Sequence, residues 1–145
     1  GSSSSSGGNP SEVQGICPDG WHVPSYGEWR QLTNYVSSQS QYVCGSDDTH
    51  IAKSLAGTTG WSSSTKTCAV GNTPSNNNAT GFSALPAGYY YYGSYYYYGS
   101  NACFWSATDN GSPNAYNSNL YHNRADEFSG IGSKDDGYSV RCVKD

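Results

Sequence analysis

Five cysteines are the residues of this chain best suited to covalent or metal chemistry. They lie far apart, and none belongs to a Cys-x-x-Cys pair, which argues against a zinc site and for disulfides in an exported protein. Because five is an odd number, one thiol must stay unpaired. The five are Cys17, Cys44, Cys68, Cys103 and Cys142.

The histidines and carboxylates give no pattern of a catalytic or metal site. His22, His50 and His122 are dispersed, without the His-x-x-x-His spacing of a metal site. No Ser-His-Asp arrangement, glycine-rich phosphate loop or pair of catalytic carboxylates can be argued. His22 is predicted to be a structural hydrogen-bonding residue beside Trp21, and His122 a surface contact. The chain is therefore predicted not to be an enzyme.

The most unusual stretch is "GYYYYGSYYYYGSNACFW", with eight tyrosines in two blocks of four. Successive side chains of a strand alternate between faces, so about half of these tyrosines must meet solvent. Tyr combines a large apolar ring, a polar tip and few torsions to freeze, as in antibody paratopes. A hairpin of ordinary mixed burial and an aggregation-prone strand are the alternatives. The absence of Leu, Ile and Val among the tyrosines favours a contact surface.

The composition of the chain argues against several classes of binding partner. The 145 residues suit one domain, and a net charge of −4 without a Lys/Arg cluster argues against nucleic acid and against a charged membrane surface. No apolar run is long enough to insert into a membrane. Residues 1–14, which open with "GSSSSSGG", are predicted to be a flexible linker, and residues 15–145 a single, monomeric domain.

The elements that must position these residues are helical first and β-rich later. Ser25 and Glu28 form a capping-box pattern, which predicts a helix from about Tyr26 to Ser37. Asp48 is predicted to cap a second helix through "THIAKSLAG", ended by Gly57. From Thr80 onward, "GFSALPAGY", "CFWSAT", "AYNSNLY" and "GYSVRCV" have the pattern of strands and turns. The order predicts an α+β domain.

Five ordered motifs carry a family resemblance. They are "CPDGWHVPSYGEW", "AKSLAGTTGW", "TGFSALPAGY", "FWSAT" and "YSVRCVKD". Together they resemble the Fibrobacter succinogenes major paralogous domain, a family of bacterial surface and secreted domains, over about Cys17 to Asp145. The resemblance implies a C-type lectin-like fold of the branch shared with formylglycine-generating enzymes, with two N-terminal helices and a β-rich, loop-rich C-terminal half.

Several members of this family look like variable proteins of diversity-generating retroelements, in which template adenines are randomised. Starting from AAC, changes in the first two bases yield Tyr, Ser, Asp, His or Gly, but not Lys, Glu, Gln, Met or Trp. Residues 89–138 hold 11 of the 14 tyrosines and are rich in Asn, Ser and Asp. Glu127 and Lys134 are departures that other codons must supply. This resemblance implies a variable surface over about 89–138.

The resemblance also bears on the cysteines and on calcium. Cys17 and Cys142 belong to motifs at both ends, which implies a disulfide tying the termini. Cys44 and Cys68 lie in two loops outside the motifs and are predicted to pair, so that Cys103 is left over. C-type lectins often bind sugars through calcium, and Asp47-Asp48, Asp109-Asn110 and Asp135-Asp136 offer oxygen donors. The sugar-binding signatures of that fold are absent, so no cofactor is predicted, with calcium as the alternative.

The four tryptophans, all within the motifs, are predicted to build the core rather than to stack on sugars. The predicted ligand-binding residues share exposure-prone positions in the variable stretch. They are Tyr90, Tyr91, Tyr92, Tyr95, Tyr96, Tyr97, Tyr98, Asn101, Cys103, Asp109, Tyr116, Asn117, Ser118, Tyr121, His122 and Asn123.

The function expected from these residues and from the resemblance is a non-enzymatic ligand-binding display domain of a bacterial protein, exported to the cell surface or the extracellular space. Its partner is expected to be a protein or glycan on another cell or surface. The alternatives are a fixed carbohydrate-binding module and an adhesin or pilus-tip domain.

Overall fold

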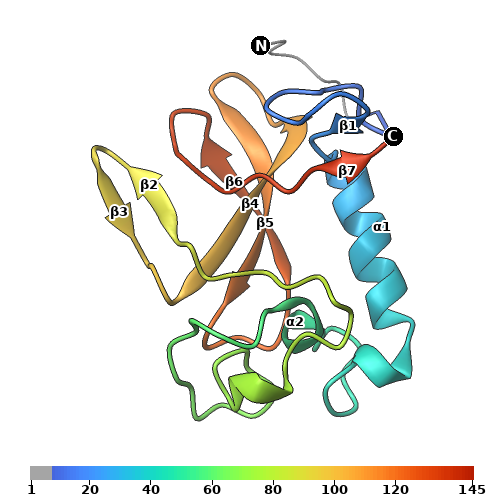
Figure 1. Cartoon of the computed structure of the whole chain (residues 1–145), viewed down its shortest axis with the longest axis vertical. Helices are drawn as coiled ribbons and strands as arrows, with labels where there is room; N and C mark the ends of the chain where they lie inside the picture. Colours follow the sequence, from blue (N-terminus) through green and yellow to red (C-terminus); the bar gives the residue numbers. More distant parts are fainter. Residues whose placement is uncertain (1–7) are drawn as a thin grey trace.

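The computed structural model describes residues 8–145, and Figure 1 shows the arrangement of its elements. In chain order they are β1 (Trp21–His22), α1 (Tyr26–Ser37), η1 (Ser40–Tyr42), α2 (Ala52–Leu55), η2 (Pro74–Asn76), β2 (Tyr89–Tyr91), β3 (Ser94–Tyr96), β4 (Asn101–Asp109), β5 (Asn114–Tyr121), β6 (Phe128–Ser133) and β7 (Val143–Lys144). Within this part of the chain the strands form three antiparallel sheets: β4-β5-β6, the β2-β3 hairpin and the β1-β7 pair. The three-stranded sheet is the centre of the molecule.

Helix α1 has the bounds that the sequence predicts. The Ser25 side chain accepts the Glu28 N–H, and the Glu28 carboxylate accepts the Ser25 N–H, so both halves of the capping box are formed. Trp29 and Val36 are buried on its inner face. They pack with Phe104 and Leu120 of the sheet, which belong to the same hydrophobic core. The helix therefore covers one face of β4 and β5.

The predicted second helix is wrong. Only Ala52–Leu55 is helical, a single turn, and Asp48 does not cap it. Ala56 already has an extended backbone and pairs with Ala84. The chain leaves the helix because the Gly57 N–H donates to the Ala84 carbonyl at 2.7 Å. This tertiary pairing overrides a weak local helix preference.

The predicted fold class needs correction accordingly. Over residues 8–145 the structure is mostly β, with one three-turn helix and one single-turn helix in place of the two N-terminal helices expected, and is α+β only in the broad sense. Two expected strands, in "CFWSAT" and "AYNSNLY", are confirmed as β4 and β5. "GFSALPAGY" is mostly irregular and reaches β2 only at Tyr89. In "GYSVRCV", the extended pairings are single bridges at Gly137 and Ser139 and the start of β7.

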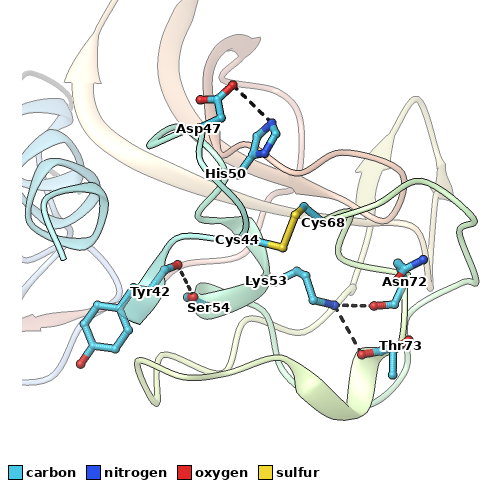
Figure 2. Close-up of a disulfide and its surroundings, with 9 residues drawn as sticks. All are labelled: Tyr42, Cys44, Asp47, His50, Lys53, Ser54, Cys68, Asn72 and Thr73. Carbon is cyan, nitrogen blue, oxygen red and sulfur yellow. Dashed lines mark hydrogen bonds and ion pairs between the residues drawn. A yellow bond between two sulfur atoms is a disulfide. The ribbon is translucent and has the colours of Figure 1, made fainter. Parts of the chain in front are cut away.

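Both predicted disulfides are confirmed. Cys17 is bonded to Cys142 and Cys44 to Cys68, while Cys103 is free and buried. Figure 2 shows the second bridge among polar contacts that fix the same loops. There the Ser54 hydroxyl donates to the Tyr42 carbonyl at 2.5 Å, and the Lys53 ammonium donates to the Asn72 carbonyl. The two disulfides indicate an oxidising, exported environment.

The N-terminal segment next to the domain packs against it. The Ser11 N–H donates to Glu28 Oε2 at 3.0 Å, and the Val23 N–H donates to the Val13 carbonyl at 2.8 Å. Packing therefore begins before residue 15, the boundary that the sequence suggests. Residues 1–7 of the predicted linker lie outside the described residues. No helix within residues 8–145 has the length and apolarity needed to cross a membrane.

Buried His22 joins the two ends of the domain. Its Nδ1 lies 2.6 Å from Asp145 Oδ1, and its Nε2 lies 2.8 Å from Glu28 Oε1. The prediction of a structural histidine matches this geometry. The hydrogen bond to Asp145 raises the pKa of His22, burial opposes this, and Glu28 adds to the rise.

The raised pKa of His22 predicts a pH-dependent stability. A group with a raised folded-state pKa stabilises fully below its unfolded pKa, here 6.5, and the contribution disappears as pH rises through the folded value. The free energy of unfolding should therefore fall as pH increases from 6.5. Urea unfolding across this range checks it, and His22→Gln should flatten the dependence. An unchanged slope in that variant would contradict the assignment.

Candidate functional site

The β2-β3 hairpin holds most of the predicted ligand-binding tyrosines. Tyr89 pairs with Tyr96, Tyr90 with Tyr95 and Tyr91 with Ser94. The two turn residues, Tyr92 and Gly93, both have positive φ angles, 43° and 83°. Two successive positive φ values are the mark of the tight hairpin turn whose twist matches that of the strands. Gly93, from the Gly-Ser pair between the two tyrosine blocks, thus forms a two-residue turn together with Tyr92.

The hairpin is anchored to the framework at its root. Tyr90 and Gly137 exchange two backbone hydrogen bonds, each 2.8 Å, and the Gly88 N–H donates to the Asn101 carbonyl at 2.8 Å. Gly88 has a φ of +66°, and a Cβ there would collide with the backbone of Tyr96 and Tyr98. Only glycine fits this close crossing of the two chain segments. Figure 1 shows the hairpin projecting away from the sheet and from α1.

Seven tyrosines of the hairpin and of the two residues that follow it, called the hairpin tyrosines below, are exposed, with exposed fractions between 40% and 88%. They are Tyr90, Tyr91, Tyr92, Tyr95, Tyr96, Tyr97 and Tyr98. Tyr92, Tyr95 and Tyr98 are the most exposed, at 88%, 80% and 84%. Strand alternation predicts that about half of these tyrosines meet solvent, and the structure exposes more than that; none of the seven is a core residue.

The two faces of the hairpin differ. Tyr89, Tyr91 and Tyr96 lie on one face, with ring centroids of Tyr89 and Tyr96 6.3 Å apart and those of Tyr91 and Tyr96 6.2 Å apart. Tyr90 and Tyr95 lie on the other face, 5.1 Å apart and nearly edge-to-face. Cross-strand aromatic pairs of this kind stabilise a short hairpin. The rings thus support each other in the exposed hairpin.

Three aromatic residues at the base of the hairpin, Tyr89, Tyr138 and Trp105, join the hairpin to the sheet. The sequence analysis did not predict this contact. The Tyr138 ring lies 5.3 Å from Tyr89 and 4.4 Å from Trp105. Burial raises the pKa of the phenol groups of Tyr138 and Tyr89, so both stay neutral. Gly132 lies against the Tyr138 ring, where a Cβ would clash. The signal in the sequence was the Gly137-Tyr138 pair, which follows a turn and begins a predicted strand.

Four predicted ligand-binding residues are buried and cannot contact a ligand: Asn101, Cys103, Asn117 and Ser118. Asn101, Cys103 and Asn117 lie on the sheet face opposite α1, which the hairpin root and Tyr138 cover. Ser118 points to the helical side and donates to Glu127 Oε1 at 2.7 Å. Each of the four is polar and lies within the stretch predicted to be variable, which is why the sequence placed it at the surface. Its burial depends on long-range packing. Burial also raises the pKa of the Cys103 thiol to about 12.

The remaining predicted residues fall into two groups. Tyr121, His122 and Asn123 lie close to the base of the hairpin, since Tyr121 pairs with Asn101 and the His122 N–H donates to the Ser100 carbonyl at 2.8 Å. Asp109 and Tyr116 lie toward the opposite end of the sheet. Asp109 forms an ion pair with Lys134 at 2.7 Å, and the Tyr116 ring lies 4.8 Å from Tyr26 of α1. The structure therefore does not bring this second group to the hairpin.

The charge around the hairpin is low. Residues 80–108 contain no Asp, Glu, Lys, Arg or His. Within residues 8–145, no group of three or more His, Cys, Asp and Glu side chains is placed to hold a metal ion. Contacts at the hairpin must therefore rely on rings, hydroxyl groups and the backbone.

Comparison with known proteins bears on the framework around this hairpin. The family model of the Fibrobacter succinogenes major domain matches residues 7–144. The chain belongs to this family. No curated protein and no solved structure matches the chain.

In this Fibrobacter succinogenes major domain, the quoted motifs supply the framework. Ala52, Leu55 and Trp61 from "AKSLAGTTGW" and Phe104 from "FWSAT" are core residues. Trp29 is also in the core, Trp105 is half-buried, and Trp21 is 40% exposed. The prediction that the tryptophans build the core is thus right for Trp29 and Trp61 and wrong for Trp21, whose strand has only two residues. The hairpin tyrosines lie outside this core.

Proposed function

We propose that this protein is a non-enzymatic ligand-binding display domain at the bacterial cell surface, with a tyrosine-rich binding surface that a diversity-generating retroelement varies. The observation that carries the proposal is the projecting hairpin with seven exposed tyrosines. Exposed aromatic patches of this kind usually mark interaction sites. Tyrosine adds contact area at a low entropic cost, as in antibody paratopes.

The framework supports this role because the residues that stabilise the fold are different from the residues proposed to bind the ligand. The two disulfides and the core between α1 and the sheet hold the domain, whereas the exposed rings contribute little to that core. Residues can therefore change on the hairpin without loss of the fold. The proposed surface consists of Tyr90 to Tyr98 and of Tyr121, His122 and Asn123 at its base.

A fixed carbohydrate-binding module is the rival function, and the ring geometry argues against it. A polysaccharide stacks best on coplanar rings, whereas the ring planes of neighbouring hairpin tyrosines meet at angles between 31° and 76°. Such tilted rings suit an irregular surface. A glycan array, probed with and without chelator, separates the two functions.

Population sequencing of this gene tests the diversification. We expect the substitutions between Tyr90 and Tyr98 to be concentrated at codons that derive from AAC codons, which encode Asn in the template. Buried Asn101 and Asn117 should vary far less than the hairpin, because larger side chains would not fit there. An invariant hairpin would overturn the variable-surface proposal and favour one fixed partner.

A further inference from the structure

One edge of the hairpin, the outer edge of β3, is open: no strand within residues 8–145 pairs with it. The N–H and C=O of Tyr90 point outward from β2 and bond Gly137, so Tyr90 and its partner Tyr95 form a pair that is not hydrogen-bonded within the hairpin. By the same alternation, the N–H and C=O of Tyr95 point outward from β3, on the opposite edge. The Tyr95 side chain is 80% exposed. An open strand edge of this kind is a template for pairing with another strand.

The open edge of β3 is self-complementary, because it can pair with the same edge of a second copy of the chain. Strand β3 has three residues, with Tyr95 at the centre. A two-fold axis through Tyr95 would place Tyr95 opposite Tyr95 of a second copy, so that the two residues exchange both backbone hydrogen bonds. Ser94 of each copy would lie opposite Tyr96 of the other. The result is a four-stranded antiparallel sheet made of two hairpins.

Charge does not oppose this contact. A surface that meets its own copy brings like charges together, which is destabilising where a strand carries Lys or Glu. The stretch from residue 80 to 108 carries no charged side chain, although the whole chain has a net charge of −4. The strands of the hairpin therefore carry no like charges that would oppose the pairing of two copies.

The pairing would stop at two copies. The outer edge of β2 is occupied by Gly137, so no further strand can add there. After Tyr96 the chain turns at Tyr97, whose φ is +57° and whose carbonyl accepts the Ser100 N–H. A closed pair rather than a fibre results, which answers the aggregation risk of eight neighbouring tyrosines.

We propose that the open edge of β3 pairs with β3 of a second copy of this chain, around Tyr95, to form a two-fold symmetric dimer. This replaces the monomeric state that the sequence suggests. The dimer does not depend on the ligand-binding function, because edge pairing leaves both faces of the hairpin open. It joins the faces of two copies into one larger tyrosine surface.

Sedimentation velocity of the full chain over a hundredfold range of concentration tests the dimer. We expect a shift from 15.5 kDa to twice that mass. Tyr95→Pro removes the outward N–H without breaking a bond inside the hairpin, and Tyr95→Lys places like charges on the two-fold axis. Each should raise the dimer dissociation constant about tenfold or more, because two hydrogen bonds are lost or opposed. Tyr35→Lys, at an exposed site on α1, should not.

Hydrogen exchange gives a second measurement on the unmodified chain. The Tyr95 amide should become protected as the dimer fills, whereas the amide of Tyr92, at the tip of the hairpin, should exchange rapidly throughout. A monomer at every concentration would overturn the proposal. A dimer that Tyr95→Pro and Tyr95→Lys leave unchanged, with an unprotected Tyr95 amide, would also overturn it.

Discussion

Replacing Tyr91, Tyr92, Tyr96 and Tyr97 together by Ser should abolish ligand binding while the melting temperature changes by only about a few degrees. All four side chains are more than 40% exposed, and none belongs to the hydrophobic core. Loss of exposed rings changes stability little, since surface substitutions usually alter it by about 0.5 kcal/mol or less each. Interface energy, in contrast, concentrates in a few aromatic residues.

Arrays of glycans and of surface-exposed bacterial proteins provide the measurement. Ligands found with the unmodified domain are titrated again with the quadruple variant, and the melting curve is recorded alongside. The matched control replaces Ile16 and Tyr35, which are 80% and 59% exposed and lie away from the hairpin, by Ser. Undiminished binding by the quadruple variant would contradict the proposed surface, and unfolding of the variant would make the tyrosines structural.

Local signals in the sequence were sufficient where the structure depends on neighbouring residues. The Ser25 and Glu28 side chains cap α1 within one turn, so their spacing alone predicts where the helix starts. The Gly-Ser pair between the tyrosine blocks likewise predicts a turn, and the structure forms it at Tyr92 and Gly93. Strand alternation predicted the exposure of about half of the eight tyrosines, whereas seven of them are exposed in the structure.

Long-range contacts explain what the sequence could not supply. The helix expected around Ala52 to Leu55 stops because the next residues pair with Ala84, 28 positions after Ala56. Strand β6 was missed because Gly130 and Gly132 are poor strand formers, yet they are needed beside Asn117 and the Tyr138 ring. Their role depends on residues of other elements.

The binding surface shows the same limit. Asn101 and Asn117 have the residue type of a variable contact, but the hairpin root covers them. A prediction from polarity alone therefore places these two residues at the surface, which is wrong. The uncharged tyrosines show the opposite: a simple hydrophobicity rule would bury them, but they are exposed. Burial in this domain is decided by which face of the central sheet the hairpin covers.

Removal of the Cys17–Cys142 disulfide should be the most destabilising change outside the hydrophobic core. The bond joins residues 125 positions apart, and Cys44–Cys68 joins residues 24 positions apart. If a disulfide acts by restricting the unfolded chain, the longer loop contributes about 5 kcal/mol and the shorter about 3.5 kcal/mol. The first bond also holds the segment before β1 against the segment before β7, where His22 joins both ends.

Two double variants compare the disulfides directly, Cys17→Ala with Cys142→Ala and Cys44→Ala with Cys68→Ala. Urea unfolding without reductant should give a free energy about 1.5 kcal/mol lower for the first variant than for the second, because of the difference in loop length. The remaining free thiol does not disturb the comparison in the folded state, since Cys103 is buried and its pKa is raised to about 12. Equal losses would show that native contacts at each bond, rather than loop length, determine the stabilisation. A larger loss for the second variant would show instead that the loops around Cys44 and Cys68, and not the tied termini, limit the stability of the domain.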